Sequence, residues 1–119
     1  MKKLPDKIAR RRRRKLRIRK KILGTPGRPR ISIFKSNRFT YVQAIDDTEG
    51  RTIATASNRE KELLGIKNGV SDLAKLGEVM ADRLKKKNIT DAVFDRNGYL
   101  YHGRVASVAE GLRKAGIRL

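Results

Sequence analysis

The chain has 119 residues, enough for one domain with an extension, because single domains commonly run about 100 to 200 residues. It carries a formal net charge of +19, from 31 Lys and Arg against 12 Asp and Glu, and 38% of its residues are hydrophobic. With no Cys and a single His, disulfides, thiolate catalysis, Cys-ligated zinc and a His-rich metal site are all excluded.

The N-terminal segment is basic, but no long apolar stretch follows it. The longest apolar runs hold two or three residues, such as residues 22–23 and 92–94. We therefore expect no secretory signal and no membrane span, with the cytoplasm as the default location. The basic segment could instead lie on an anionic membrane, but Leu16 and Ile18 would contribute little insertion energy. A membrane partner therefore ranks below nucleic acid.

Residues 10–21 form the most basic part of the chain, with ten Arg or Lys among twelve residues. Residues 1 to about 22 are compatible with a helix, because Arg and Lys are good helix formers and Pro and Gly are absent from 6–23. In isolation, repulsion between charges four residues apart would fray this helix. Residues 24–29 contain two Pro and two Gly, which end it. We predict a basic RNA-binding arm and linker at 1–29 and an α/β domain at 30–119.

The domain begins with three predicted strands. Residues 31–35, 39–45 and 51–57 alternate in character or are rich in β-branched side chains, and two polar segments, residues 36–38 and 46–50, separate them as turns. In the second strand, Phe39, Tyr41, Gln43 and Ile45 share one face. Short turns between consecutive strands predict an antiparallel meander.

A helical spacing of apolar residues follows from Val70 to Leu84, with Asn68 or Ser71 as candidate N-cap. Residues 91–94 read as a fourth strand, parallel to a meander strand because a helical crossover precedes it. A second amphipathic helix begins near Val105 and is closed by Gly116. The order β-β-β-α-β-α predicts a small mixed four-stranded sheet covered by its helices, an α/β fold.

The arginine run is the strongest functional signal. From residue 7 to residue 45 there are fifteen basic residues and no acidic one. The alternative interpretation is a solvated, disordered tail or a targeting signal. Nucleic acid fits this charge density better, because Lys and Arg release counterions from phosphates and the Arg fork also stacks on bases. The cations predicted to bind RNA here are Arg10, Arg11, Arg12, Arg13, Arg14, Lys15, Arg17, Arg19, Lys20, Lys21, Arg28 and Arg30.

Two other segments add candidate RNA contacts. The hairpin tip carries two cations and two small polar side chains, although plain turn chemistry explains Ser and Asn equally well. The loop 96–104 mixes aromatic residues for stacking with cations for phosphate, and its glycines allow close approach. The alternative is that its tyrosines pack on the sheet edge and its histidine caps the next helix. The predicted contacts are Lys35, Ser36, Asn37, Arg38, Arg96, Tyr99, Tyr101, His102 and Arg104.

An enzyme is not predicted. The element order resembles that of ribonuclease-H-like nucleases, which hold metal ions with carboxylates on adjacent strands. Here residues 31–35 contain no acidic residue, Asp46, Asp47 and Glu49 lie in a turn, and Asp95 has no evident partner carboxylate at the place that metal binding requires. Two-metal chemistry needs several converging carboxylates, and no glycine-rich phosphate-binding motif occurs. We therefore expect no catalytic residue, no cofactor and no metal.

Four segments together resemble the family of bacterial large-subunit ribosomal protein eighteen. They are residues 20–25 (KKILGT), 28–37 (RPRISIFKSN), 41–47 (YVQAIDD) and 94–105 (FDRNGYLYHGRV), and the similarity covers essentially the whole chain in the same order. Tyr41 and Gln43, within these segments, complete the predicted RNA contacts.

The resemblance implies a structural ribosomal protein that binds 5S ribosomal RNA and helps to dock it, with the central protuberance, onto 23S ribosomal RNA. It also implies a ribonuclease-H-like α/β/α body without catalysis, a neighbouring 5S-binding ribosomal protein as partner and a location in cytoplasmic ribosomes. We expect a monomer off the ribosome. The alternatives are a non-specific DNA-compacting nucleoid protein, which would need little base stacking, and, third, an enzyme acting on RNA.

Overall fold

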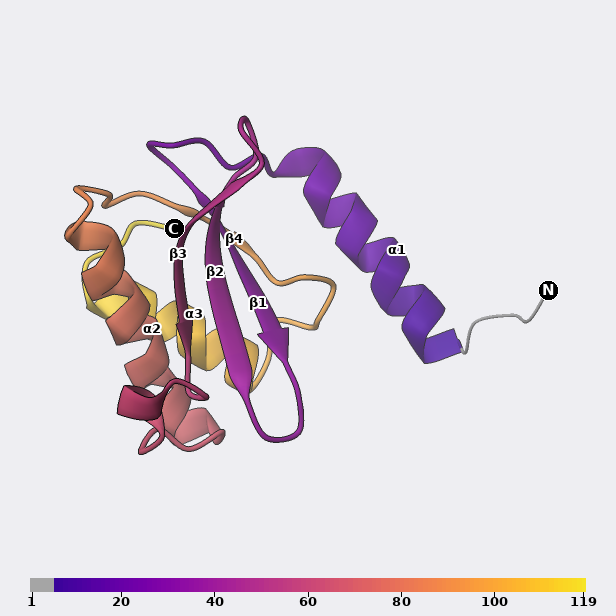
Figure 1. The fold of residues 1–119 in the computed structure, drawn as a ribbon. Helices are drawn as coiled ribbons and strands as arrows, with labels where there is room; N and C mark the ends of the chain where they lie inside the picture. Colours follow the sequence, from indigo (N-terminus) through magenta and orange to yellow (C-terminus); the bar gives the residue numbers. More distant parts are fainter. Residues whose placement is uncertain (1–5) are drawn as a thin grey trace.

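The computed structural model describes residues 6–119, without the side chains of residues 18–21. Its elements, in chain order, are α1 (Asp6–Lys21), β1 (Arg30–Lys35), β2 (Thr40–Asp46), β3 (Arg51–Ser57), the 3₁₀ turn η1 (Lys61–Leu63), α2 (Val70–Lys85), β4 (Val93–Asp95) and α3 (Arg104–Lys114). The element order predicted from the sequence is confirmed (Figure 1).

The four strands form one mixed sheet in the order β3-β2-β1-β4. β1 pairs antiparallel with β2, and β2 pairs antiparallel with β3, which is the predicted meander. β4 pairs parallel with β1, from Val93 beside Arg30 to Asp95 beside Ser32. The α/β class, the mixed four-stranded sheet and the parallel fourth strand are thus confirmed.

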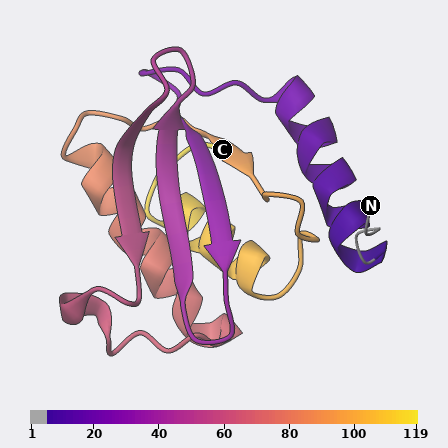
Figure 2. The same cartoon turned by 45° about the vertical axis from the view of Figure 1, so that its right-hand side comes forward.

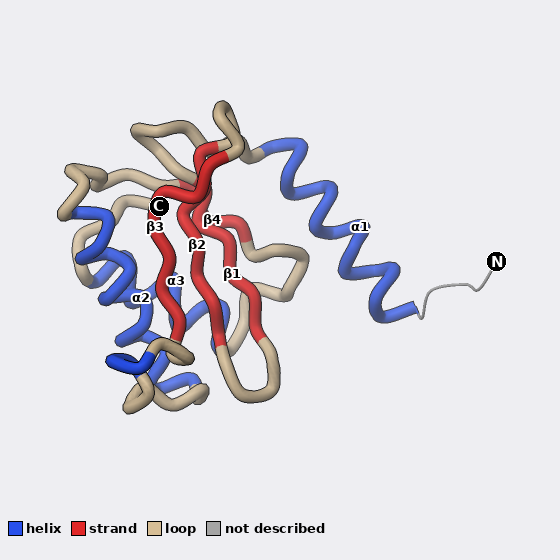
Figure 3. Tube along the Cα trace, in the orientation of Figure 1, coloured by secondary structure: helices blue, strands red, loops and turns tan. Residues whose placement is uncertain are grey.

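Both α2 and α3 cover the same face of the sheet (Figures 1 and 3). Their buried side chains form one core with the strand residues of that face: Ile31, Ile33, Val42, Ala44, Ala56, Leu73, Leu76, Met80, Leu84, Val105, Val108 and Leu112. The helices touch backbone to backbone at Gly77 and Gly111, where a side chain would overlap the partner helix. Residues 30–119 therefore form two layers. The three-layer α/β/α arrangement implied by the resemblance is wrong for this body, since the opposite face carries no body helix.

The start of α2 differs from the prediction. Its N-cap is Gly69, without a side-chain capping hydrogen bond, so neither Asn68 nor Ser71 caps the helix. Asn68 instead donates through Nδ2 to the carbonyl oxygen of Ser36 at 3.1 Å and accepts from the Thr40 hydroxyl at 2.6 Å. It thereby ties the β1–β2 hairpin to the segment before α2. At the end of α3, Gly116 adopts φ +99°, consistent with the predicted closure.

The basic helix α1 lies beside the sheet, away from α2 and α3, and next to the loop that follows β4 (Figure 2). The linker that follows α1 is fixed to the turn between β2 and β3: the Gly24 amide donates to Asp47 Oδ2 at 2.7 Å, and the Asp47 amide donates to the Gly24 carbonyl at 2.9 Å.

None of the helices within residues 6–119 is long and apolar enough to cross a membrane.

Candidate nucleic-acid interface

The cations of α1 divide between two sides of the helix. Arg10, Arg13 and Arg17 recur at spacings of three and four residues and are exposed, whereas Arg11 and Arg14 are partly buried. The two buried ones bind the loop after β4: Arg14 Nε donates to the Gly98 carbonyl at 2.9 Å, and Arg11 Nε donates to the Asn97 carbonyl at 3.3 Å. One side of α1 therefore holds the helix in place, and the other presents guanidinium groups to solvent.

The helix approaches this loop at Gly98, which adopts φ +78°. A Cβ at that position would lie 2.5 Å from the Arg11 carbonyl oxygen. Beside it, the Arg11 guanidinium lies 4.0 Å from the centre of the Tyr99 ring, and the Tyr99 hydroxyl donates to the Lys35 carbonyl at 3.3 Å. Tyr99 is thus a packing residue between α1 and β1, which agrees with the structural alternative for this tyrosine.

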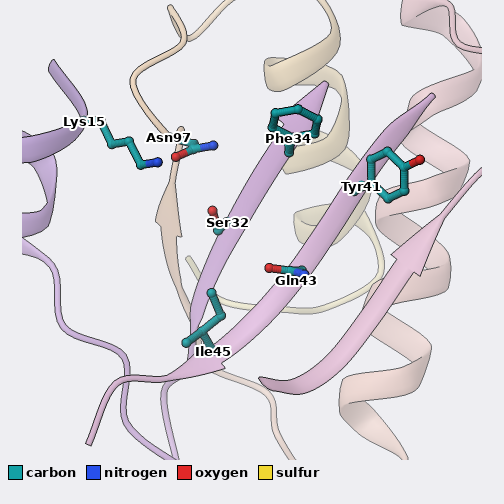
Figure 4. Close-up of a pocket in the computed structure, with 7 residues that line it drawn as sticks. All are labelled: Lys15, Ser32, Phe34, Tyr41, Gln43, Ile45 and Asn97. Atoms are coloured by element: carbon teal, nitrogen blue, oxygen red, sulfur yellow. The ribbon is translucent and has the colours of Figure 1, made fainter. Parts of the chain in front are cut away.

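The sheet face opposite the core is open to solvent beside α1. Phe34, Tyr41 and Gln43 point outward from β1 and β2 (Figure 4), and the Phe34 side chain is half exposed. The Phe34 and Tyr41 rings lie 6.1 Å apart between centroids, tilted by 47°. A cavity of about 510 Å³ lies over this face, lined by Lys15, Ser32, Phe34, Tyr41, Gln43, Ile45 and Asn97.

A buried ion cluster fixes one end of this face. Arg30, only 7% exposed, donates to Asp95 Oδ2 at 2.7 Å, to Asp47 Oδ2 at 2.9 Å and to Asp47 Oδ1 at 2.9 Å. The hydrogen bond to Asp47 is the main cause that raises the pKa of Arg30, against the opposing effect of burial. Arg30 is therefore hydrogen-bonded within the fold, which argues against the RNA contact predicted for it but does not test it. The partner of Asp95 in this cluster is thus a cation, Arg30.

The same cluster bears on metal chemistry. The guanidinium of Arg30 sits between the two carboxylates that β4 and the turn after β2 bring together. A divalent cation needs carboxylates that are not already neutralised by a cation. No group of three or more His, Cys, Asp or Glu residues within the described part of the chain is arranged to hold a metal ion.

The remaining residues of loop 96–104 have divergent surroundings. Tyr101 is 45% exposed, lies edge-on to Phe94 and accepts a hydrogen bond from Arg113 at 2.9 Å. Arg104 donates to the Ser36 carbonyl at 2.9 Å, so it links α3 to the hairpin tip. His102 is exposed, and the N-cap of α3 is Gly103 without a side-chain hydrogen bond, so the capping alternative for His102 is wrong.

Positive charge is concentrated where α1, the hairpin and α3 meet. Partial burial, followed by the nearby charges of Arg104, Arg11 and Lys7, lowers the pKa of Lys35. Cations held this close repel one another, and an anion placed between them would relieve the repulsion. At the hairpin tip itself, the Ser36 hydroxyl is engaged with the Phe39 backbone, while Asn37 and Arg38 are exposed.

The structure brings together only part of the predicted set. Lys15, Tyr41 and Gln43 line the cavity, and the cationic groups of Arg11 and Lys35 both lie over the Tyr99 ring. Arg12 and Arg28 are exposed, Arg96 is partly buried beside Tyr101, and the side chains of Arg19, Lys20 and Lys21 lie outside the described residues. Sequence reasoning missed Ser32, Phe34 and Asn97. The alternation with Ile31 and Ile33 could have found the first two, but no local signal marks Asn97.

Comparison with known proteins gives a consistent result. The family model described as ribosomal L18 of archaea, bacteria, mitochondria and chloroplast matches residues 5–119. The large ribosomal subunit protein uL18 of Treponema denticola is 53% identical over 117 residues, 98% of each chain. That of Borreliella burgdorferi is 54% identical over 120 residues, the full length of both chains. That of Sorangium cellulosum is 51% identical over 114 residues, 93% of this chain and 96% of the relative.

Proposed function

The chain belongs to the ribosomal L18 family, and from this premise we propose that it is a structural constituent of the large ribosomal subunit. There it binds 5S ribosomal RNA and helps to attach it to 23S ribosomal RNA in the central protuberance. Its location is then the cytoplasm, within ribosomes engaged in translation. Off the ribosome it is a monomer.

The observation that carries this proposal is the two-sided basic helix beside an open, partly aromatic sheet face. Arg10, Arg13 and Arg17 offer exposed guanidinium groups for phosphates, and Phe34 and Tyr41 lie across the cavity from Lys15. Phosphate contacts supply affinity, while aromatic side chains on a sheet stack on unpaired bases. A protein that binds folded RNA needs both kinds of contact within one surface.

We assign phosphate contact to the exposed Arg10, Arg12, Arg13, Arg17 and Arg28, and to Lys15, Arg19, Lys20 and Lys21 of the same basic arm. Contact with RNA more generally is assigned to Lys35, Asn37, Arg38, Tyr41, Gln43, Arg96, Tyr101 and His102. Arg11, Arg14, Tyr99, Ser36 and Arg104 support that surface through the hydrogen bonds and ring contacts described above. The partners are 5S and 23S ribosomal RNA and a neighbouring 5S-binding ribosomal protein, bridged mainly through RNA.

The body itself is proposed to be a ribonuclease-H-like unit without catalysis, and residues 1–29 to act as its basic arm. The β-β-β-α-β-α connectivity supports the first assignment. The Arg30 guanidinium between Asp47 and Asp95 supports the absence of metal-dependent cleavage, because it neutralises two carboxylates that a metal ion would need.

A competition experiment tests the function. The full-length protein, bound to labelled 5S RNA, is challenged with unlabelled 5S RNA, an unrelated structured RNA and duplex DNA of equal length. We expect 5S RNA to compete best at physiological salt, because non-specific phosphate contact is shared by all three competitors. Equal competition by duplex DNA would replace this proposal with the DNA-compacting alternative. A metal-dependent cleavage assay on the same RNA tests the third, enzymatic alternative.

A further inference from the structure

We propose that the cavity between α1 and the open sheet face receives one unpaired base of the bound RNA, a base that carries an exocyclic amino group. This inference rests on the proposed function and specifies how one part of the surface works. Figure 4 shows the arrangement: Lys15 extends from α1 on one side, and Phe34, Tyr41 and Gln43 line the sheet on the other.

The size of the cavity suits such an occupant. Its volume of about 510 Å³ falls in the range of about 300 to 1,000 Å³ that is usual for pockets holding small organic ligands. Its floor is made by side chains of β1 and β2 that point away from the core, and Asn97 and Lys15 form its wall. A flat aromatic base fits a site with a sheet as floor, whereas a duplex is too wide to enter.

The floor supplies a stacking surface. Phe34 is a large apolar side chain left half exposed near the hairpin end of β1, next to a tilted Tyr41 ring. Exposed aromatic side chains on a sheet surface stack on unpaired bases, and the energy depends little on which base is bound. Nothing in the described fold covers Phe34, so its exposed area is available to a partner.

The wall supplies an unused hydrogen-bond acceptor. Asn97 is 6% exposed, and its Oδ1 atom is buried without a hydrogen-bond partner among the described residues. The Asn97 backbone is held from two directions: its amide donates to Asp95 Oδ1 at 2.8 Å, and its carbonyl accepts from Arg11 at 3.3 Å. Buried polar atoms in folded proteins nearly always have a hydrogen-bond partner. We therefore infer that a bound ligand supplies the donor for this oxygen.

Of the donors that RNA offers, the exocyclic amino groups of adenine, cytosine and guanine project furthest from the ring, so they reach a recessed oxygen most easily. The imino N–H of guanine or uracil and the ribose 2′-hydroxyl lie closer to their rings and are the competing donors. Gln43, whose amide is exposed on the floor of the cavity, both donates and accepts and can pair with the edge of the same base. Lys15, which lines the cavity, can meet a phosphate next to that base.

Binding measurements with matched variants test this. Phe34→Ala removes the stacking surface and Asn97→Gly removes the acceptor while tolerating the φ of +54° at that position. Leu64→Ala, at an apolar side chain 60% exposed outside the cavity, is the control. We expect Phe34→Ala to weaken 5S RNA binding by about 5- to 100-fold. We expect Leu64→Ala to have almost no effect, and all three variants to keep the wild-type circular dichroism spectrum.

Chemical probing then identifies the base. One nucleotide of 5S RNA should be protected by the wild-type protein and reactive in the complexes with Phe34→Ala and Asn97→Gly. Replacing its base by the analogue without the amino group, purine for adenine or inosine for guanine, should weaken binding to the wild type but not further weaken binding to Asn97→Gly.

The outcomes separate the two proposals. If the wild type prefers 5S RNA while Phe34→Ala and Asn97→Gly bind as tightly as Leu64→Ala, the base pocket is wrong and the proposed function stands. If the wild type shows no preference for 5S RNA over duplex DNA, the function itself fails, and this inference fails with it.

Discussion

Three exposed arginines of α1 and two bonded arginines of the body have different surroundings. Arg10, Arg13 and Arg17 are exposed along one side of α1, whereas Arg30 is buried between two carboxylates and Arg104 holds the carbonyl of Ser36. An Arg that is hydrogen-bonded inside the fold contributes to stability and to the position of its neighbours. An Arg in solvent contributes almost nothing to stability and remains available for phosphate. In so basic a protein, burial and partners therefore separate structural cations from binding cations, and charge alone does not.

The strongest test of this contrast is deletion of residues 1–22. If the α1 cations replace counterions on phosphates, deletion should flatten the plot of log binding constant against log salt by about 3 to 5 units. Affinity should fall broadly alike for all RNAs, because phosphate contacts do not read sequence. The slope is measured by titration at several salt concentrations. An unchanged slope would show that α1 does not contact RNA.

A longer deletion tests whether the domain at 30–119 folds alone. Its core lies between the sheet and the helices α2 and α3, without a residue of α1. A fragment from residue 28 onward should therefore unfold cooperatively on heating and give a mixed α/β circular dichroism spectrum. A fragment without a thermal transition would mean that α1, through its contacts with the loop after β4, is needed for folding.

Arg30→Ala should produce the next largest effect, on stability. Removing Arg30 leaves Asp95, which has no exposed side-chain surface, without the cation at 2.7 Å. Breaking a buried pair on one side costs about 3 to 5 kcal/mol. Urea denaturation should show this loss for Arg30→Ala, while the control Arg13→Ala stays within about 0.5 kcal/mol of the wild type. Equal stability of the two variants would show that the buried Arg30 contributes no more to the free energy of unfolding than the exposed Arg13.

Loop 96–104 contains both RNA-binding candidates and residues bonded within the fold. Single substitutions should distinguish the two kinds. Tyr101→Ala and Arg96→Ala should reduce the preference for 5S RNA over an unrelated structured RNA, by about 1 to 3 kcal/mol for a lost base stack at Tyr101. Arg104→Ala should lower the thermal stability as well, since it loses the bond to the Ser36 carbonyl. Competition binding and thermal denaturation of the same variants provide both readings. An unchanged preference in all three would make the loop purely structural.

The smallest effect concerns a half-exposed ion pair of the body. The hydrogen bond from Arg83 lowers the pKa of Glu60 from its ordinary value. Because the folded pKa lies below the unfolded one, the contribution is present above about pH 4.5 and is lost as the pH falls through the folded pKa. Solvent screening limits it to about 1 kcal/mol or less. Urea denaturation between pH 6 and pH 3 should show that the free energy of unfolding depends less on pH in Glu60→Gln than in the wild type.

The sheet was predictable from the sequence because its signals are local. Alternation along residues 31–57 and the turn chemistry between them predict the meander, and the helical spacing from Val70 predicts the crossover that makes β4 parallel. The resemblance supplied a third layer that the body does not have. That error arose because connectivity alone does not say which face a helix covers.

The site was less predictable because its decisive contacts join distant residues. Arg30 and Asp95 are 65 positions apart, so no local pattern distinguishes this Arg from those of α1. Likewise, Asn68 looked like a helix cap but bonds to a hairpin more than 25 residues earlier. Exposed cations, in contrast, need no partner within the chain, and the basic run was readable from composition alone.

The seating of α1 on the loop at Gly98 also sets an order of events during synthesis. Arg14 meets the Gly98 carbonyl 84 residues later in the chain, so α1 has nowhere to dock until the last fifth of the protein has been made. At about 5 to 20 residues per second, this is a delay of several seconds. Throughout that interval α1 lacks the loop carbonyls that Arg11 and Arg14 bind in the folded protein. The helix α1 is therefore made early but can dock on the body only after Asn97 and Gly98 have been made.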